Sequence, residues 1–209
     1  MPTIVCVAGG ARAIVPVPRD VDGLLPLALS RPSEALARAR AVLAGEPDHY
    51  ESSVAHQAVG IVLREFGDVE AGVRELREAL RLARRSGRTD READVLATLG
   101  VGLVFAGRTA AGLIALDRAF QRSSGVLAAQ VQVRRGMMLY SLGRYPAALD
   151  DLRKSAIVLR RAGDLLWTAR ALNMRAIVHL AVGSTRRADA DFASAGHLFT
   201  GAGQELEAL

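Results

Sequence analysis

The 209-residue chain contains one cysteine, one lysine and one asparagine, and only 4% of its residues are aromatic. A single cysteine, Cys6, excludes a disulfide framework and a cysteine-rich zinc site. The scarcity of aromatic residues argues against an all-β sandwich or barrel, because aromatic and β-branched residues are the ones that favour strands. We also expect no histidine-based metal site, because the four histidines lack metal-ligand spacing; they are His49, His56, His179 and His197.

No apolar run reaches the roughly 18 residues that a membrane-spanning helix needs. The first six residues, Met-Pro-Thr-Ile-Val-Cys, lack the basic segment that opens a secretory signal. Half of the residues are hydrophobic and 23% are charged, which excludes a disordered chain. These properties predict a cytoplasmic, mostly helical protein with no membrane partner.

The net charge is +5 and the isoelectric point is near 10.3, values that would suit a nucleic-acid-binding protein. The basic residues are almost all arginine, however, with Lys154 as the only lysine and Asn173 as the only asparagine. Lysine and asparagine have AT-rich codons, so this bias indicates a GC-rich genome. The densest basic run, residues 81–91, is diluted by acids at Asp90, Glu92 and Asp94 and is interpreted as a solvated helix end. We expect no specific nucleic-acid partner, since net charge indicates one only where it clusters.

One pattern of small and apolar residues recurs four times along the chain. Each copy predicts two helices joined by a glycine turn. The turn glycines recur at a nearly constant spacing, and they are Gly67, Gly107, Gly143 and Gly183. A glycine inside a helix costs about 1 kcal/mol relative to alanine, so recurrent small residues within the helices indicate close helix packing. They are Gly60, Gly100, Gly136 and Ala176 in the first helix, and Gly72, Gly112, Ala148 and Ala188 in the second.

Each half of the repeated unit has the spacing of an amphipathic helix; in the first copy, Val69, Val73 and Leu76 share one face. The pattern predicts an all-α fold, a right-handed solenoid of antiparallel helix hairpins with repeats of roughly 36–40 residues. We expect a disordered or loosely packed lead-in at 1–19 and a repeat domain at 20–209. The expected units are a half or degenerate unit at 20–47, four units at about 53–87, 93–123, 129–163 and 169–200, and the start of another at 203–209.

Three segments carry small and large apolar residues in the same register: Gly-Asp-Val-Glu-Ala-Gly at 67–72, Leu-Gly at 99–100 and Gly-Arg-Tyr-Pro-Ala-Ala-Leu at 143–149. They resemble the tetratricopeptide repeat (TPR), and the resemblance covers about residues 30–209. That family usually has repeats of about 34 residues. We expect the additional residues in the loops between hairpins, at 84–90 and 160–164, because loops tolerate insertions. Before the first full unit, Ser33 is the predicted N-cap of a helix.

The resemblance implies a curved solenoid whose first helices line a concave groove that binds a protein or peptide. Transferred to this sequence, the family's groove positions are Gln57, Ile61, Arg64, Ala97, Val101, Val104, Gln130, Val133, Met137, Tyr140, Arg170, Asn173 and Ile177, together with Val54, Asp94 and Leu180. The middle of this set is apolar and its rim is polar, which suits a bound helix or extended segment. Alternatively, further repeats of the same superhelix cover these apolar positions.

Two finer resemblances stay open. The segments at 53–64, 91–100 and 203–207 are similar to the N-terminal TPR region of actinobacterial-type CHAT-domain proteins, in which a caspase-like peptidase domain follows the repeats. The long repeat spacing also resembles that of TPR sensor modules of bacterial transcriptional regulators. The partner is therefore expected to be a protein or peptide segment, and a downstream domain of the same polypeptide is one candidate.

The sequence contains no recognisable catalytic, metal or cofactor site, so we expect a non-catalytic protein without a cofactor. Cys6 has no histidine or acid placed beside it by the sequence. Asp150 and Asp151 are expected to be surface charges of one helix. Trp167 is expected to pack between adjacent units.

The last residues begin a further unit and stop, which predicts an uncapped apolar end. We expect Phe192 to be held by its own hairpin, and Phe199 and Leu206 to be exposed. This end predicts either self-association through residues 185–209 or fraying of that segment.

Overall fold

The computed structural model describes residues 21 and 23–201. The predicted lead-in at 1–19 and the expected unit start at 203–209 lie outside these residues. The described part contains helices and no strands. The helices are α1 (Leu24–Ser30), α2 (Pro32–Ala44), α3 (His49–Glu65), α4 (Val69–Arg85), α5 (Thr89–Phe105), α6 (Thr109–Gln121), α7 (Gly125–Ser141), α8 (Tyr145–Arg161), α9 (Leu165–Ala181) and α10 (Thr185–Gly201).

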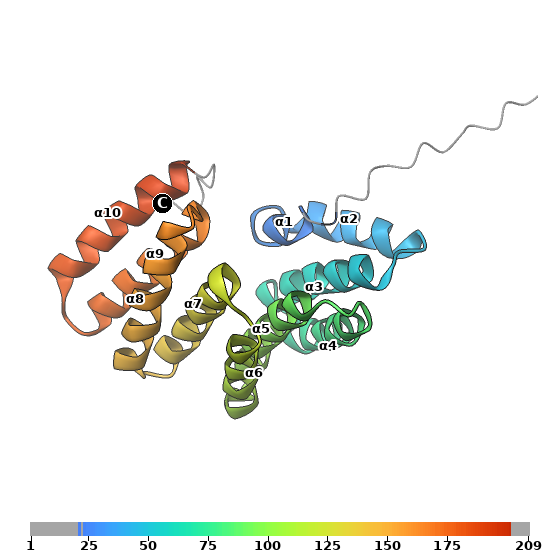
Figure 1. Cartoon of the computed structure of the whole chain (residues 1–209), viewed down its shortest axis with the longest axis horizontal. Helices are drawn as coiled ribbons and strands as arrows, with labels where there is room; N and C mark the ends of the chain where they lie inside the picture. The colour runs from blue at the N-terminus through green and yellow to red at the C-terminus, as the bar shows by residue number, and fades with distance from the viewer. Residues whose placement is uncertain (1–20, 22, 202–209) are drawn as a thin grey trace, which may run out of the picture.

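Consecutive helices form antiparallel hairpins that follow one another along an arc (Figure 1). The first helices of the full hairpins also contact one another in order: α3 packs against α5, α5 against α7, and α7 against α9. They line the inner side of the arc, and α4, α6, α8 and α10 lie on its outer side. The predicted all-α solenoid of helix hairpins is confirmed.

The extra length of each repeat lies in its helices and not in its loops. Helices α3 and α4 have 17 residues each, and only short turns at 66–68 and 86–88 follow them. The expectation of longer loops at 84–90 and 160–164 was wrong, because α4 and α8 continue to residues 85 and 161. The one shorter spacing of turn glycines, from Gly107 to Gly143, arises because α6 has 13 residues, about one helical turn fewer than α4 or α8.

The small residues inside the hairpins mark backbone-to-backbone contacts, as expected. A Cβ atom added to Gly100 would lie 2.9 Å from the carbonyl oxygen of Gly112 and 2.8 Å from Cγ of Leu116. Gly60 and Gly72 meet in the same way in the preceding hairpin. A side chain at these positions would force α5 and α6, or α3 and α4, apart.

The turn glycines serve a different purpose, which is to adopt positive φ. Gly107 has φ of 76°, and in the described part of the chain no atom lies within 4 Å of the position of its absent Cβ. This conformation ends a helix at low cost only for glycine, because other residues clash with their own carbonyl group there. The turn glycines thus end the first helix of each hairpin, as predicted.

Helix α2 begins earlier than the sequence indicated. Its N-cap is Arg31 and its first residue is Pro32, so Ser33 lies inside the helix and is not the cap. Proline suits the first helical position because its φ is already helical and because a backbone N–H at that position would have no acceptor within the helix. The cap prediction was therefore wrong by two positions.

The apolar end of α10 is also covered differently from the prediction. Phe199 is only 2% exposed, whereas Phe192 is partly exposed. Phe199 lies four residues after Ala195 on the same helix face, and both belong to one apolar cluster with Ala169 and Leu172 of α9. The expected exposure of Phe199 was wrong, and Leu206 lies outside the described residues.

Candidate functional site

The predicted groove residues lie on the four inner helices, but they are less exposed on α3 and α5 than on α7 and α9. On α3 and α5, Gln57 and Ala97 are fully buried, while Ile61 and Val101 are 9% and 7% exposed. Val133 on α7 is fully buried as well. These positions are covered because neighbouring inner helices pack directly against one another. In this conformation they contribute to helix packing and present almost no surface to a ligand.

The partly exposed groove positions lie mainly on α7 and α9. On these two helices they are Gln130, Met137, Tyr140, Arg170, Asn173 and Ile177; Arg64, Asp94 and Val104 are the partly exposed positions on α3 and α5. Leu180, one turn beyond Ile177, is 48% exposed. We call the α7 and α9 members, with Leu180, the open inner surface.

The side chain of Arg64 is mostly covered by its neighbours. Its side chain is 9% exposed and forms an ion pair with Glu65. Its guanidinium carbon lies 5.5 Å from the centre of the Phe105 ring, a distance at which a cation is attracted to the ring face. Arg64 therefore joins the end of α3 to the end of α5.

A buried polar cluster links the inner helices. We define the inner polar cluster as Ser53 and Gln57 of α3, Arg91, Asp94 and Thr98 of α5, and Arg134 of α7. Gln57 Nε2 donates to Asp94 Oδ2 at 3.0 Å and to Thr98 Oγ1 at 2.7 Å. Arg91 Nε donates to Ser53 Oγ at 3.1 Å, and Arg134 Nη1 lies 2.8 Å from Asp94 Oδ1. Three successive hairpins thus share one polar contact network.

Asp94 is the centre of charge in this cluster. Burial by itself raises the pKa of a carboxyl group, but Arg134 and Arg91, aided by the hydrogen bond from Gln57, lower the pKa of Asp94 below its usual value. Burial in turn lowers the pKa of Arg91. Two guanidinium groups therefore surround one carboxylate, and the cluster carries a net positive charge. Within the described residues, Gln57 Oε1 and Arg91 Nη2 have no hydrogen-bond partner.

The burial of Arg91 corrects the interpretation of the basic run at 81–91 as a wholly solvated helix end. Arg91 is 6% exposed because its guanidinium enters the inner polar cluster. The other members fit the interpretation better: Arg81 pairs with Glu78, and Arg84 pairs with Glu92 at 3.0 Å. This arrangement neutralises much of the run.

Trp167 packs between adjacent units, as predicted. The guanidinium of Arg134 on α7 lies 4.8 Å from the indole ring centre, and that of Arg170 lies 5.1 Å from it. Asp164 caps α9 by accepting from the Trp167 backbone N–H at 3.1 Å, and it also accepts from Gln130 Nε2 at 2.9 Å. The start of α9 is thereby tied to α7 at one end of the open inner surface.

The sequence did not reveal two buried ion pairs that hold the last hairpins together. Arg135 of α7 forms two hydrogen bonds with Asp151 of α8, at 2.7 and 2.8 Å, and Arg175 of α9 bonds Asp191 of α10 in the same way. Asp151 is 5% exposed, so its expected place on the helix surface was wrong. The two pairs have the same separation along the chain, and comparing charged residues between aligned repeats would have found them.

The titratable groups do not assemble into a metal site in the described part of the chain. His56 Nδ1 lies 2.6 Å from Glu75 Oε2 and so links α3 to α4. Burial lowers the pKa of His179 on α9. No helix in the described ranges combines the length and the hydrophobicity that a membrane span requires. Cys6 lies outside the described residues.

Residues 127–195, from α7 into α10, match the family model of the tetratricopeptide repeat. No curated protein sequence matches the chain at a significant level. The structure is similar to that of aspartyl phosphate phosphatase F from Bacillus subtilis, with a TM-score of 0.66 and 12% identity over 90% of this chain and 50% of the phosphatase chain. This chain therefore corresponds to about half the length of that phosphatase.

Two other solved structures have the same architecture. The apo form of RapI has a TM-score of 0.63 and 12% identity, covering 88% of this chain and 71% of its own. BtubC from P. vanneervenii has a TM-score of 0.57 and 16% identity, covering 90% and 87%. At these identities the similarity concerns the fold. Together with the matched segment, it shows that the fold is an all-α solenoid like that of tetratricopeptide-repeat proteins.

Proposed function

We propose that the chain is a non-catalytic protein–protein interaction scaffold whose open inner surface binds a peptide or helix. The observation that carries this proposal is the partly exposed apolar strip formed by Met137, Tyr140, Ile177 and Leu180 on two adjacent inner helices. Apolar side chains that remain accessible in rows on neighbouring helices are suited to the apolar face of another helix.

Polar side chains border this strip and can orient a ligand. Gln130, Arg170 and Asn173 lie on the same two helices, nearer their N-terminal ends. They can donate hydrogen bonds to the backbone or acidic side chains of a bound segment. The inner polar cluster fills the space between α3 and α5, so we place the ligand over α7 and α9 and not along the whole arc.

Two biological contexts are compatible with this scaffold. We propose first that it is the regulatory N-terminal part of a larger CHAT-type peptidase protein, on the resemblance of segments 53–64 and 91–100. The alternative is a TPR sensor module of a bacterial transcriptional regulator, favoured by the long repeats. Sequencing the reading frame downstream of Leu209 separates the two: a domain with spaced histidine and cysteine supports the first, and a helix-turn-helix domain supports the second.

Peptide display tests the binding surface without knowledge of the partner. Peptides selected from a random twelve-residue library against the whole chain are measured by fluorescence anisotropy on Ile177→Glu and Leu180→Glu variants. We expect each variant to weaken binding at least tenfold, because a carboxylate is placed in the apolar strip. Ile114→Glu is the matched control, since Ile114 is 52% exposed on α6, outside the inner surface. Equal binding to all three variants contradicts the proposal.

A further inference from the structure

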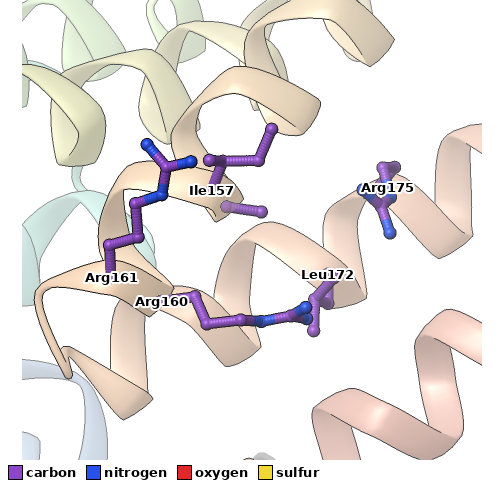
Figure 2. A pocket seen from close by; sticks show the side chains of 6 residues that line it. Ile157, Arg160, Arg161, Leu172 and Arg175 are labelled. Carbon is purple, nitrogen blue, oxygen red and sulfur yellow. The ribbon is translucent and has the colours of Figure 1, made fainter.

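A second surface lies apart from the inner side, where α8 meets α9. We call it the α8–α9 hollow; its volume is about 220 Å³, and Figure 2 shows its lining of Ala156, Ile157, Arg160, Arg161, Leu172 and Arg175. The α9 members differ from the groove positions of that helix. Arg175 instead faces α10, because it bonds Asp191 there. The hollow thus lies at the junction of α8 and α9, on a face of α9 that differs from its groove face.

The repeat itself provides a reference for this surface. Helices α4 and α5 begin at Val69 and Thr89, and helices α8 and α9 begin at Tyr145 and Leu165. The residue numbers of the two helix pairs therefore differ by one constant amount. The same difference places Arg160 and Arg161 at the positions of Arg84 and Arg85. The α4–α5 junction is therefore a copy of the same site within one molecule.

Acids neutralise two arginines, Arg81 and Arg84, in the α4–α5 copy. Glu92 Oε1 forms ion pairs with Arg84 Nε at 3.0 Å and with Arg122 Nη1 at 2.6 Å, and Glu78 pairs with Arg81. The positions equivalent to Glu78 and Glu92 are Lys154 and Thr168 in the α8–α9 copy. Both acids have thus been replaced, one of them by a cation.

The α8–α9 copy consequently has unbalanced charge beside an apolar floor. Arg160 and Arg161 are exposed and form no ion pair with any described residue. Ile157 stands where the other copy has Arg81, and it is 45% exposed. Arg175 uses Nε and Nη2 for Asp191, which leaves its Nη1 outside that pair. The lining contains no acidic side chain.

We propose that the α8–α9 hollow binds an acidic peptide segment that carries one large apolar side chain between its carboxylates. The apolar side chain lies on Ala156, Ile157 and Leu172, and the carboxylates pair with Arg160 and Arg161. Arginine is the residue best suited to such pairs, because its planar group donates two parallel hydrogen bonds to a carboxylate.

The size and composition of the hollow select a peptide over other ligands. Small-molecule sites usually span roughly 300–1,000 Å³, so about 220 Å³ fits one side chain better than a whole small molecule. Single-stranded nucleic acids bind through aromatic stacking platforms, and the lining has no aromatic residue. The apolar floor would face a phosphate backbone without any favourable contact.

Anisotropy titration of the whole chain with defined probes tests this proposal. The probe is a fluorescein-labelled ten-residue peptide in which one leucine is flanked by two glutamates on each side and the remaining residues are glycine and serine. One control peptide has glutamine for each glutamate, and another has alanine for the leucine. A twelve-nucleotide single-stranded DNA probe reports nucleic-acid binding.

We expect saturable binding of the probe that weakens at least tenfold in the double variant Arg160→Gln, Arg161→Gln. The matched control is Arg84→Gln, Arg85→Gln, which removes the same charge at the equivalent positions and should weaken binding less than twofold. Both control peptides should bind at least fivefold more weakly than the probe. Exposed arginines are replaced in both variants, so circular dichroism should show unchanged folding.

Three outcomes overturn the proposal: absence of saturable binding to the wild-type chain, equal weakening by the two double variants, or tighter binding of the DNA probe than of the peptide. Equal weakening would show a general charge effect, and preferred DNA binding would show a nucleic-acid surface. None of these variants lies on the open inner surface, so the outcome is independent of the proposed groove function.

Discussion

Arg134 of α7 reaches Asp94 of α5 at 2.8 Å while its guanidinium stacks on Trp167 of α9. One side chain therefore connects three successive hairpins of the solenoid. In repeat proteins each unit contacts only its neighbours, so stability depends on the interfaces between units. A charged group shared by three units couples those interfaces.

Replacement of Asp94 by asparagine should destabilise the chain by about 3 kcal/mol, because it leaves the buried Arg91 and the mostly covered Arg134 as like charges without a counterion. Urea denaturation followed by circular dichroism measures the change in the free energy of unfolding. Asp150→Asn is the control, since Asp150 pairs with Arg153 and Lys154 on the surface, where ion pairs contribute little to stability. Similar losses in the free energy of unfolding for the two variants would show that the inner polar cluster does not stabilise the fold.

Acid should remove the contribution of Asp94 in a defined direction. Folding lowers the pKa of Asp94 from its ordinary value of 3.8, so its stabilisation is complete above that value. It is lost as the pH falls below about 4 and through the folded-state pKa. Urea denaturation between pH 7 and pH 2 should show a steeper loss for the wild type than for Asp94→Asn. Parallel pH profiles would contradict the assignment.

Replacement of Gly100 by alanine should destabilise the chain by about 1–3 kcal/mol, because the new Cβ would lie 2.9 Å from the carbonyl oxygen of Gly112. Gly100→Leu should be more damaging still. Gly201→Ala is the control, since no atom of a described residue lies within 4 Å of its added Cβ. Thermal melting compares the variants, and an unchanged midpoint for Gly100→Ala would argue against the close approach of α5 and α6.

Removal of Arg135 should cost about 2–3 kcal/mol, because Asp151 is buried and loses both hydrogen bonds from its guanidinium partner. Arg153→Ala serves for comparison, as Arg153 pairs with Asp150 on the surface. Urea denaturation should place Arg135→Ala well below Arg153→Ala in stability. If the two variants match, the α7–α8 hairpin does not depend on this pair.

The sequence was most informative where a structural requirement is local. The positive φ of Gly107 favours a glycine, and the close helix contact at Gly100 requires a small residue, at the same place in every copy. Helix ends were less reliable, as the misplaced N-cap at Ser33 shows, because proline and serine both suit the start of a helix. The length of α4 was also missed, since a charged helix end such as Arg84 and Arg85 resembles a loop in composition.

The amino-acid sequence by itself determined the all-α class, the helix hairpins and the repeat spacing, because apolar periodicity and glycine positions act within a few residues of one another. The tertiary structure decided which charges are buried. Arg91 and Asp151 have the sequence environment of surface residues, yet neighbouring hairpins bury them, and Asp94 is mostly covered beside Arg91. Their burial depends on how each hairpin is rotated against the next. That rotation results from packing between residues in different repeats, such as Gln57 and Thr98, which no local pattern records.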